Sequence, residues 1–331
     1  MAEPLPVLLI GCGGIAQAYV QALARTPTLR LCGLVDVAEP PRRALAASTG
    51  VPAVATLDQA LGAPDRPAAA IVLTPPRDHE TLAVQLLQHG LHVLCEKPLA
   101  PTVASARRML DTAARRGCRL MMGSKFRYTA DVTAARQLLD AGRCGDLVLY
   151  ENVFCSHVDM TRRWNSDPTV SGGGVLIDNG CHSVDLARYL LGPIARVQAQ
   201  FGRLVQPLSV EDTARLLFTS HEGALGSIDL SWSVHKETDA YVRIHGTRGV
   251  IEVGWRGSRF KTVGSAWQTF GNGYDKLAAF AAQLANFAGA VRGDERAVID
   301  DADALASVIV VDCAYRSARE ERWVQVPAET G

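Results

Sequence analysis

Several features that would point to particular classes of protein are missing from this sequence. No run of apolar residues is long enough to form a membrane-spanning helix. The 34 basic residues are balanced by 34 acidic residues, and no long run of one sign occurs. The chain therefore lacks the charge pattern of a protein that binds nucleic acid or an anionic membrane, and we expect neither among its partners.

Cysteine pairs with the spacing of a metal or redox site are missing as well. The eight cysteines are scattered, and no two of them form a C-x-x-C pair. We interpret them as reduced, mostly buried side chains of a cytoplasmic protein, and we expect no bound metal.

The length of the chain and the order of its elements indicate two domains. A chain of 331 residues, of which 48% are hydrophobic, can form two cores. Over residues 1–123, short apolar strands alternate with helices, which predicts a doubly wound parallel sheet, that is, a Rossmann fold. Over residues 124–331, several strands follow one another without helices, which predicts an α+β domain with an open, mostly antiparallel sheet. The expected fold class is therefore α/β.

A glycine-rich loop follows the first apolar strand. Residues 6–10 lead directly into Gly11-Cys-Gly-Gly-Ile-Ala16, and the next residues have the spacing of a helix. This is the G-x-G-x-x-A pattern, in which glycines allow a tight turn and let the backbone approach a pyrophosphate at the helix N-terminus. Asp36 lies 20 residues after Ala16, at the end of the second apolar strand, where an acid would bind the adenosine ribose hydroxyls. These features predict a dinucleotide site.

Glu96, Lys97 and Pro98 follow another apolar strand, residues 92–95. In isolation, a neighbouring Glu and Lys are commonly a surface ion pair of little energetic weight. The position favours a functional role, because ligands of open parallel sheets bind outside the carboxyl ends of the strands. At that edge, an ammonium can donate to a substrate hydroxyl and stabilise the alkoxide that develops as hydride leaves.

The second candidate segment, Ser171 to Asp185, contains three consecutive glycines directly after Ser171. The apolar periodicity of residues 175–191 predicts one helix. Asp178 and His182 are four residues apart, so their side chains share a helix face with Asp185. A carboxylate beside an imidazole can hold one tautomer and support the charged form, as in general acid–base catalysis. The alternative is a surface helix on which these side chains only face solvent.

These motifs together resemble the glucose-fructose oxidoreductase, inositol dehydrogenase and rhizopine-catabolism (Gfo/Idh/MocA) family. The motifs are Gly11-Cys-Gly-Gly-Ile-Ala16, Glu96-Lys-Pro98 and the segment from Gly172 through Asp178 to His182. The glycine loop is shared with many dehydrogenases, whereas the combination with the other two motifs is much more specific. The resemblance covers essentially the whole chain and includes the order of the two domains.

The resemblance implies a role for each of three residues. Lys97 would bind the reacting hydroxyl, His182 would be the general acid/base on the same oxygen, and Asp178 would orient the substrate or the imidazole. The Lys97–Pro98 peptide is expected to be cis. The residues implied along the cofactor are Gly11, Gly13, Gly14, Ile15, Asp36, Thr74, Pro75, His79, Glu96, Lys97 and Arg127. Family members commonly have Asn at Pro76 and often Arg at Lys125, and these departures affect the nicotinamide side.

Further residues are candidates for the substrate side. An aromatic face beside hydrogen-bonding groups suits a sugar or cyclitol, and His157 and Trp164 precede the catalytic helix in the company of Asp159, Arg162 and Arg163. The alternative is that Trp164 covers apolar surface and the arginines are solvated. The full expected substrate set is Lys97, Arg127, His157, Trp164, Asp178 and His182, with His235, Lys236 and Tyr241 as weaker candidates.

The resulting expectation is an NAD-dependent dehydrogenase or ketoreductase that acts on a CH–OH group of a polyol, sugar, aminosugar or cyclitol. NADP remains possible because Arg42 and Arg43 follow Asp36 closely. Two alternatives are a glycosidase that oxidises its substrate transiently and retains NAD, and a dinucleotide-sensing regulator without catalysis. The open sheet predicts a homodimer or homotetramer.

Overall fold

The computed structural model describes residues 3–236 and 238–327, and the chain divides into two compact units. Unit 1 consists of residues 1–125 and 276–304, and unit 2 consists of residues 126–275 and 305–331. None of the helices in the described ranges is long and apolar enough to cross a membrane.

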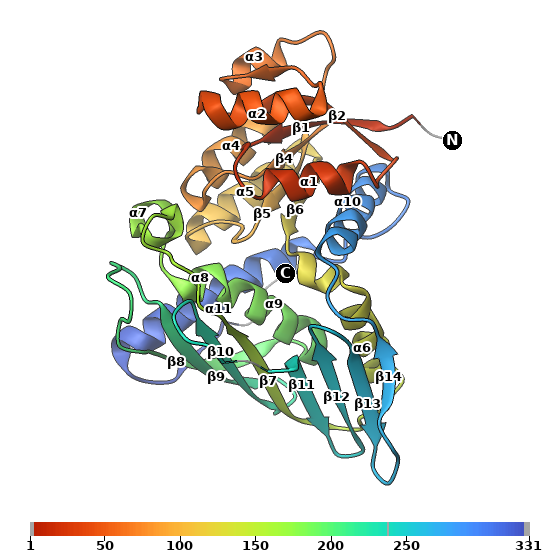
Figure 1. Ribbon diagram of the computed structural model, residues 1–331, viewed down its shortest axis with the longest axis vertical. Coiled ribbons are helices and arrows are strands. Elements are labelled where there is room, and N and C mark those ends of the chain that lie inside the picture. Colours follow the sequence, from red (N-terminus) through yellow and green to blue (C-terminus); the bar gives the residue numbers. More distant parts are fainter. Residues whose placement is uncertain (1–2, 237, 328–331) are drawn as a thin grey trace. The chain divides into compact units, whose positions relative to one another are not determined.

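Within the described residues, the sheet of unit 1 has six parallel strands in the order β3-β2-β1-β4-β5-β6 (Figure 1). This is the strand order of the Rossmann fold, so the prediction for the first domain is confirmed. Strands β1 and β4, at the centre of the sheet, are wholly apolar because both of their faces are buried. The strands are β1 (Leu5–Ile10), β2 (Leu29–Val35), β3 (Ala53–Val54), β4 (Ala69–Val72), β5 (His92–Glu96) and β6 (Leu120–Gly123).

The helices of unit 1 begin and end at recognisable signals. The Thr102 hydroxyl accepts a hydrogen bond from Ser105 N–H and caps α5, and Gly117 ends that helix with a φ of 63°. A capping box formed by Thr56 and Gln59 starts α3. The helices are α1 (Ala16–Leu23), α2 (Glu39–Thr49), α3 (Leu57–Leu61), α4 (Pro76–Gln88), α5 (Val103–Arg116) and α10 (Lys276–Arg292).

Helix α10 belongs to unit 1, although the sequence placed it in a second domain of residues 124–331. It packs on α1, where the rings of Tyr19 and Phe280 lie with centroids 4.5 Å apart. Leu284 and Phe287 join the same buried core. The expected boundary near residue 123 lies close to the first crossing between the units, but residues 276–304 return to unit 1 because their apolar side chains complete its core.

In the described part of unit 2, nine strands form one sheet in the order β14-β13-β12-β11-β7-β10-β9-β8-β15. Neighbouring strands are antiparallel except β7 and β10, which are parallel, so the predicted open and mostly antiparallel sheet is confirmed. The strands are β7 (Leu147–Cys155), β8 (Ile194–Phe201), β9 (Thr213–Ser220), β10 (Leu225–Ser231), β11 (Ala240–Gly246), β12 (Gly249–Gly254), β13 (Ser258–Thr262), β14 (Gln268–Gly271) and β15 (Val324–Gln325).

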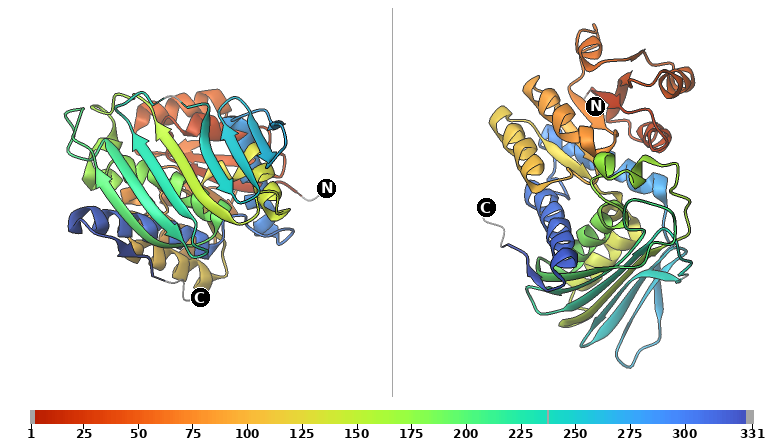
Figure 2. Two further views of the ribbon diagram at one scale, coloured as in Figure 1. Left: turned by 90° about the horizontal axis from the view of Figure 1, so that it is seen from below. Right: turned by 90° about the vertical axis from the view of Figure 1, so that its left-hand side faces the viewer.

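The helices of unit 2 cover one face of its sheet and leave the other face open (Figure 2). Side chains of Tyr150, Phe218 and Ile228 point to the covered face and are almost completely buried. On the open face, Leu149, Leu217 and Leu225 keep 46%, 42% and 54% of their surface exposed. The helical segments are η1 (Lys125–Tyr128), α6 (Ala130–Asp140), η2 (Trp164–Ser166), α7 (Pro168–Ser171), α8 (Val175–Asp178), α9 (Gly180–Leu191) and the part of α11 (Asp301–Glu320) from Leu305 onward.

Candidate functional site

The glycine loop of unit 1 forms a tight turn between β1 and α1. Gly11 has a φ of +95°, and a Cβ atom there would lie 2.9 Å from the Leu73 carbonyl carbon, so no larger residue fits. Gly13 and Gly14 are exposed, and a Cβ at either would meet no atom within 4 Å. Gly11 is thus closely packed against the Leu73 backbone, whereas Gly13 and Gly14 leave the backbone of the loop open to a pyrophosphate.

Asp36 lies beside this loop, as the motif predicts. Its Oδ2 accepts a hydrogen bond of 2.6 Å from Cys12 N–H, and its Oδ1 accepts one of 2.8 Å from Ala38 N–H. The Arg42 guanidinium donates to the Asp36 backbone carbonyl at 2.5 Å, whereas Arg43 pairs with Glu39. Burial, followed by the Asp36 charge, raises the pKa of Cys12 to about 11, so this thiol is protonated at neutral pH.

Thr74 and Pro75 follow strand β4 and introduce helix α4. Pro75 is the N-cap residue of α4, and both residues are partly buried. Within the described part of the chain, the buried Thr74 hydroxyl has no hydrogen-bond partner. A buried polar group without an internal partner is costly, so this hydroxyl fits a contact with a ligand at the carboxyl edge of the sheet.

The Glu96 carboxylate is bonded within unit 1. Its Oε1 accepts a hydrogen bond of 2.6 Å from the Tyr19 hydroxyl, and its Oε2 accepts one of 3.1 Å from Lys97 N–H. The Tyr19 hydroxyl in turn accepts a hydrogen bond of 2.9 Å from the Gln283 side chain of α10. The Lys97–Pro98 peptide is cis, in agreement with the expectation from the family resemblance. The hydrogen bond from the Lys97 N–H to Glu96 therefore fixes the backbone at the start of the segment Lys97 to Leu99.

His79 does not have the environment of a residue that contacts a cofactor. Its side chain is completely buried, and both ring nitrogens face carbonyl oxygens of unit 1. Nε2 lies 2.8 Å from the Thr74 oxygen, and Nδ1 lies 2.9 Å from the Pro98 oxygen. The placement of His79 along the cofactor stays a prediction from the resemblance, and in this structure its ring nitrogens face the carbonyls that follow two neighbouring strands.

Asp178 and His182 lie in unit 2, at a break between two helices. The single helix expected over residues 175–191 is divided at Asn179 into α8 and α9. Asn179 keeps right-handed helical dihedrals, so Asp178 and His182 remain about one turn apart along the chain. His182 is 6% exposed, and its ring meets the Phe126 ring edge-on with centroids 5.0 Å apart. A mostly buried imidazole is held in a defined orientation by this packing, which suits proton transfer at a fixed point.

Two residues that the sequence did not reveal hold the start of α8. Glu211 Oε1 accepts hydrogen bonds from Gly174 N–H and Leu176 N–H, each 3.1 Å, and from the Tyr315 hydroxyl at 2.7 Å. A Cβ atom on Gly174 would lie 2.1 Å from the Glu211 backbone oxygen, which explains the glycine. Burial raises the pKa of Glu211, although the Tyr315 hydrogen bond acts in the opposite direction. The glycine run signals close packing, but nothing in the sequence identifies the partners.

Arg127 is buried in unit 2 rather than displayed toward a ligand. Its side chain is 2% exposed, and its guanidinium pairs with the fully buried Asp185 of α9 at 2.6 Å. The same guanidinium lies over the Tyr189 ring, 5.1 Å from the centroid. The cofactor and substrate contacts of Arg127 stay predictions from the resemblance, and the ion pair with Asp185 ties η1 to the helix that carries His182.

The remaining substrate-side candidates differ in their surroundings. His157 is exposed and stacks on the exposed His235, with ring centroids 5.5 Å apart and planes 15° apart. Both residues follow the parallel strands β7 and β10, whose carboxyl ends meet at one edge. Trp164 is 46% exposed.

Asp159, Lys236 and Tyr241 have partners within unit 2. The Asp159 carboxylate accepts hydrogen bonds from Thr161 and closes a turn. Lys236 pairs with Asp229 on the open sheet face. Tyr241 is the second residue of β11, is 1% exposed and packs on Phe154 and Trp255. Arg162 and Arg163 are exposed.

The unit division assigns the candidate residues to two groups. Lys97 and the residues implied along the cofactor, except Arg127, belong to unit 1, whereas Asp178, His182, His157 and Trp164 belong to unit 2. In residues 3–236 and 238–327, no group of three or more His, Cys, Asp or Glu side chains could hold a metal ion.

Two family models match the chain. Residues 5–124 match the oxidoreductase family with an NAD-binding Rossmann fold, described as GFO_IDH_MocA, and residues 132–252 match a GFO/IDH/MocA C-terminal domain. Inositol 2-dehydrogenase from Rhizobium meliloti (strain 1021) is 25% identical over 351 residues, with 96% of this chain and 98% of that protein covered. The rhizopine catabolism protein MocA from Rhizobium meliloti is 27% identical over 312 residues and 92% of each chain.

Solved structures share the same arrangement of the chain. A levoglucosan dehydrogenase in complex with NADH matches with a TM-score of 0.90 at 21% identity, with 98% of this chain and 100% of that chain covered. At this identity the likeness establishes the fold.

Proposed function

Because the chain belongs to the Gfo/Idh/MocA family of oxidoreductases, whose first domain is an NAD-binding Rossmann fold, we propose that it is an NAD-dependent dehydrogenase acting on a CH–OH group. The substrate class that we propose is a polyol, sugar or cyclitol. The observation that carries the proposal is the combination of an intact dinucleotide loop and the strand-end Lys97 in unit 1 with a buried His182 one turn after Asp178 in unit 2.

Each of these residues has a chemical task in the proposed reaction. NAD, when bound, supplies the hydride acceptor. His182 takes the proton of the reacting hydroxyl, because an imidazole with an unperturbed pKa of about 6.5 can accept and release a proton near neutral pH. The Lys97 ammonium donates to the same oxygen and stabilises the negative charge that grows on it. Asp178 orients the substrate or the imidazole.

The glycine loop and two polar residues of unit 1 fit the binding of NAD. Gly13 and Gly14 present open backbone, Thr74 has a hydroxyl without an internal partner in the described chain, and Asp36 places a carboxylate beside the loop. The Asp36 carboxylate would bind the ribose diol and repel the 2′-phosphate of NADP.

The proposed substrate class follows from the relatives and from the surface of unit 2. Relatives of this chain are named for inositol and levoglucosan, which are a cyclitol and an anhydrosugar. In unit 2, Trp164 and the stacked pair of His157 and His235 offer ring faces and hydrogen-bonding nitrogens. Such groups suit a ligand with apolar C–H faces and several hydroxyls.

The experiment is a panel of inositols, aldoses and anhydrosugars, with NAD, in which the absorbance of the reduced nicotinamide is followed. We expect substrate-dependent NADH formation with at least one compound and none with the His182→Ala variant. If every polyol and sugar is inert while NADH binds tightly, the chain is a dinucleotide-binding protein without this activity. Turnover of a glycoside without net NADH would assign it to the NAD-retaining glycosidases.

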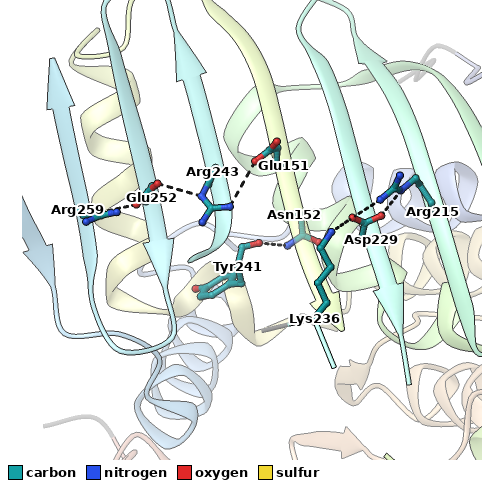
Figure 3. A network of polar contacts seen from close by, with 9 residues as sticks. All are labelled: Glu151, Asn152, Arg215, Asp229, Lys236, Tyr241, Arg243, Glu252 and Arg259. Carbon is teal, nitrogen blue, oxygen red and sulfur yellow. Dashed lines mark hydrogen bonds and ion pairs between the residues drawn. The ribbon is translucent and has the colours of Figure 1, made fainter. Parts of the chain in front are cut away.

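We further propose that the open sheet face of unit 2 pairs with a second copy of the chain. Strand registers place Leu217, Leu225 and Leu149 on this face, next to charged residues. Figure 3 shows those residues: Arg243 bridges Glu252 and Glu151, and Asp229 lies between Arg215 and Lys236. Exposed apolar residues flanked by both signs of charge suit a self-complementary contact across a two-fold axis.

A further inference from the structure

The fully buried His79 is a titratable side chain for which the proposed reaction has no use. It lies in the first turn of α4, and no part of its surface is exposed. Its ring is nevertheless placed between two strand ends that the proposed function depends on. The Thr74 carbonyl follows β4, and the Pro98 carbonyl follows β5.

The contacts of this ring are all with backbone oxygens. Nε2 lies 2.8 Å from the Thr74 oxygen, and Nδ1 lies 2.9 Å from the Pro98 oxygen and 3.3 Å from the Leu99 oxygen. Strands β4 and β5 are parallel neighbours, with Val72 opposite Cys95. The imidazole therefore spans the two chain segments directly after the strands, where the ladder of strand hydrogen bonds has ended.

Hydrogen-bond chemistry makes histidine the suitable residue at this position. Carbonyl oxygens are acceptors, so each contact requires an N–H from the ring. A neutral ring donates from one nitrogen, and the imidazolium donates from both. Burial lowers the pKa of His79, and the Thr74 and Pro98 carbonyls and the Glu96 carboxylate oppose that effect. The neutral tautomer with its proton on Nδ1 donates to the Pro98 carbonyl, and the imidazolium donates to both segments.

We propose that His79 is a positioning residue for Lys97, acting through the Pro98 carbonyl and not through any contact with the cofactor. Lys97 precedes Pro98 directly, and the Lys97 N–H donates a hydrogen bond to the Glu96 carboxylate. Loss of the His79 contacts would free the Pro98 carbonyl and let the segment move. A displacement of about 1 Å at a catalytic group can cost on the order of 10²-fold in rate. The inference rests on the proposed catalytic role of Lys97.

The test is a double-mutant cycle between His79→Leu and Lys97→Ala. We expect His79→Leu to lower kcat by roughly 10- to 100-fold, in keeping with the cost of misplacing a catalytic group. In the Lys97→Ala background, the same substitution should change kcat by less than twofold, since the group that it positions is gone. The Kd for NADH, measured by fluorescence quenching, should stay within twofold of that of the wild type.

A matched control and a conservative variant separate positioning from folding. His89→Leu makes the same substitution at the exposed end of α4 and should leave kcat unchanged. His79→Gln keeps an N–H donor, so it should recover part of the kcat lost in His79→Leu. If His79→Leu does not fold, the cycle is run with His79→Gln.

Each outcome decides a different question. Additive effects of His79 and Lys97 substitutions on kcat, or a weakened Kd for NADH in His79→Leu, would overturn the positioning role. A Lys97→Ala enzyme with normal kcat would instead overturn the proposed function, whatever His79 does. Coupled effects with normal NADH binding would support both.

Discussion

The two units hold their candidate catalytic residues by different means. In unit 1, the Lys97 segment is fixed by groups of the same Rossmann fold: His79 on α4, Glu96 at the end of β5, and Tyr19 on α1. In unit 2, the start of α8 is held by Glu211 and Tyr315, which lie 37 and 141 residues away from Gly174. In unit 1 these groups lie at the ends of strands and on the helices beside them, whereas in unit 2 a partly buried carboxylate and a hydroxyl bond the backbone of the glycine run.

The largest expected effect comes from removing the proposed catalytic group of each unit. His182→Ala in unit 2 and Lys97→Ala in unit 1 should each lower kcat by about 10²–10⁴-fold, the usual contribution of a positioned proton-transfer group. Asp178→Asn should have a smaller effect on kcat and should weaken substrate binding. Because the proposal has both residues act on one oxygen, the double variant should lose much less than the sum of the two effects.

The control for this prediction is His221→Ala, which removes an exposed histidine of unit 2 and should leave kcat unchanged. NADH binding, followed by protein fluorescence quenching, should persist in all of these variants. A His182→Ala enzyme with near-normal kcat would contradict the catalytic role proposed for His182 in unit 2.

A second prediction tests whether the unit 2 segment depends on its long-range partners. In Gly174→Ala, the new Cβ would collide with the Glu211 backbone oxygen, so the free energy of unfolding should fall by about 1–3 kcal/mol. The start of α8 should also shift and lower kcat. Urea unfolding and steady-state kinetics measure the two effects.

Gly257→Ala is the matched control, because its Cβ would meet a single atom at 3.4 Å and its backbone is outside the left-handed region. Equal losses of stability in both variants would contradict the role assigned to the Glu211 contact.

A third prediction concerns the cofactor side of unit 1. The wild type should prefer NAD to NADP by at least roughly tenfold in kcat/KM, or about 1.4 kcal/mol, because the Asp36 carboxylate repels a 2′-phosphate. Asp36→Asn keeps an acceptor for Cys12 N–H but removes the charge, so it should narrow this preference. A wild-type preference for NADP would show that Arg42 outweighs Asp36.

The smallest effect on catalysis is expected from the open sheet face of unit 2. Leu217→Asp buries a charge in the proposed contact between two copies, so light scattering should show dissociation to monomers while kcat per chain stays the same. Val298→Asp makes an equivalent change at an exposed site of unit 1 and should leave the assembly intact. A wild-type monomer at micromolar concentration would end the proposal of self-association.

Much of unit 1 could be predicted from the sequence because its strands are buried on both faces and read as short apolar runs. The same logic placed Gly11, Asp36 and Lys97 at strand ends. The sequence does not predict that the His79 side chain is buried inside unit 1. A histidine in the first turn of a helix has the same sequence pattern whether it faces a ligand or a neighbouring strand end.

Unit 2 was harder to predict in detail. Residues 258–271 form two strands, β13 and β14, and Gly264 adopts a φ of 80° in the turn between them. The ion pair of Arg127 could not be predicted, because its partner Asp185 is 58 residues away. Glu211 and Tyr315 carry no local motif. Contacts of this length are decided by tertiary packing, which periodicity does not encode.

Because α10 belongs to unit 1, a single cut near residue 123 does not divide the chain into its two units. Gln283 on α10 donates to the Tyr19 hydroxyl, and Tyr19 donates to Glu96, the neighbour of Lys97. A fragment that stops near residue 123 would keep the dinucleotide loop but would expose Tyr19 and lose this chain of hydrogen bonds. A chimera that joins unit 1 to the substrate domain of another protein therefore has to include residues 276–304. The segments that make up the two units alternate along the sequence.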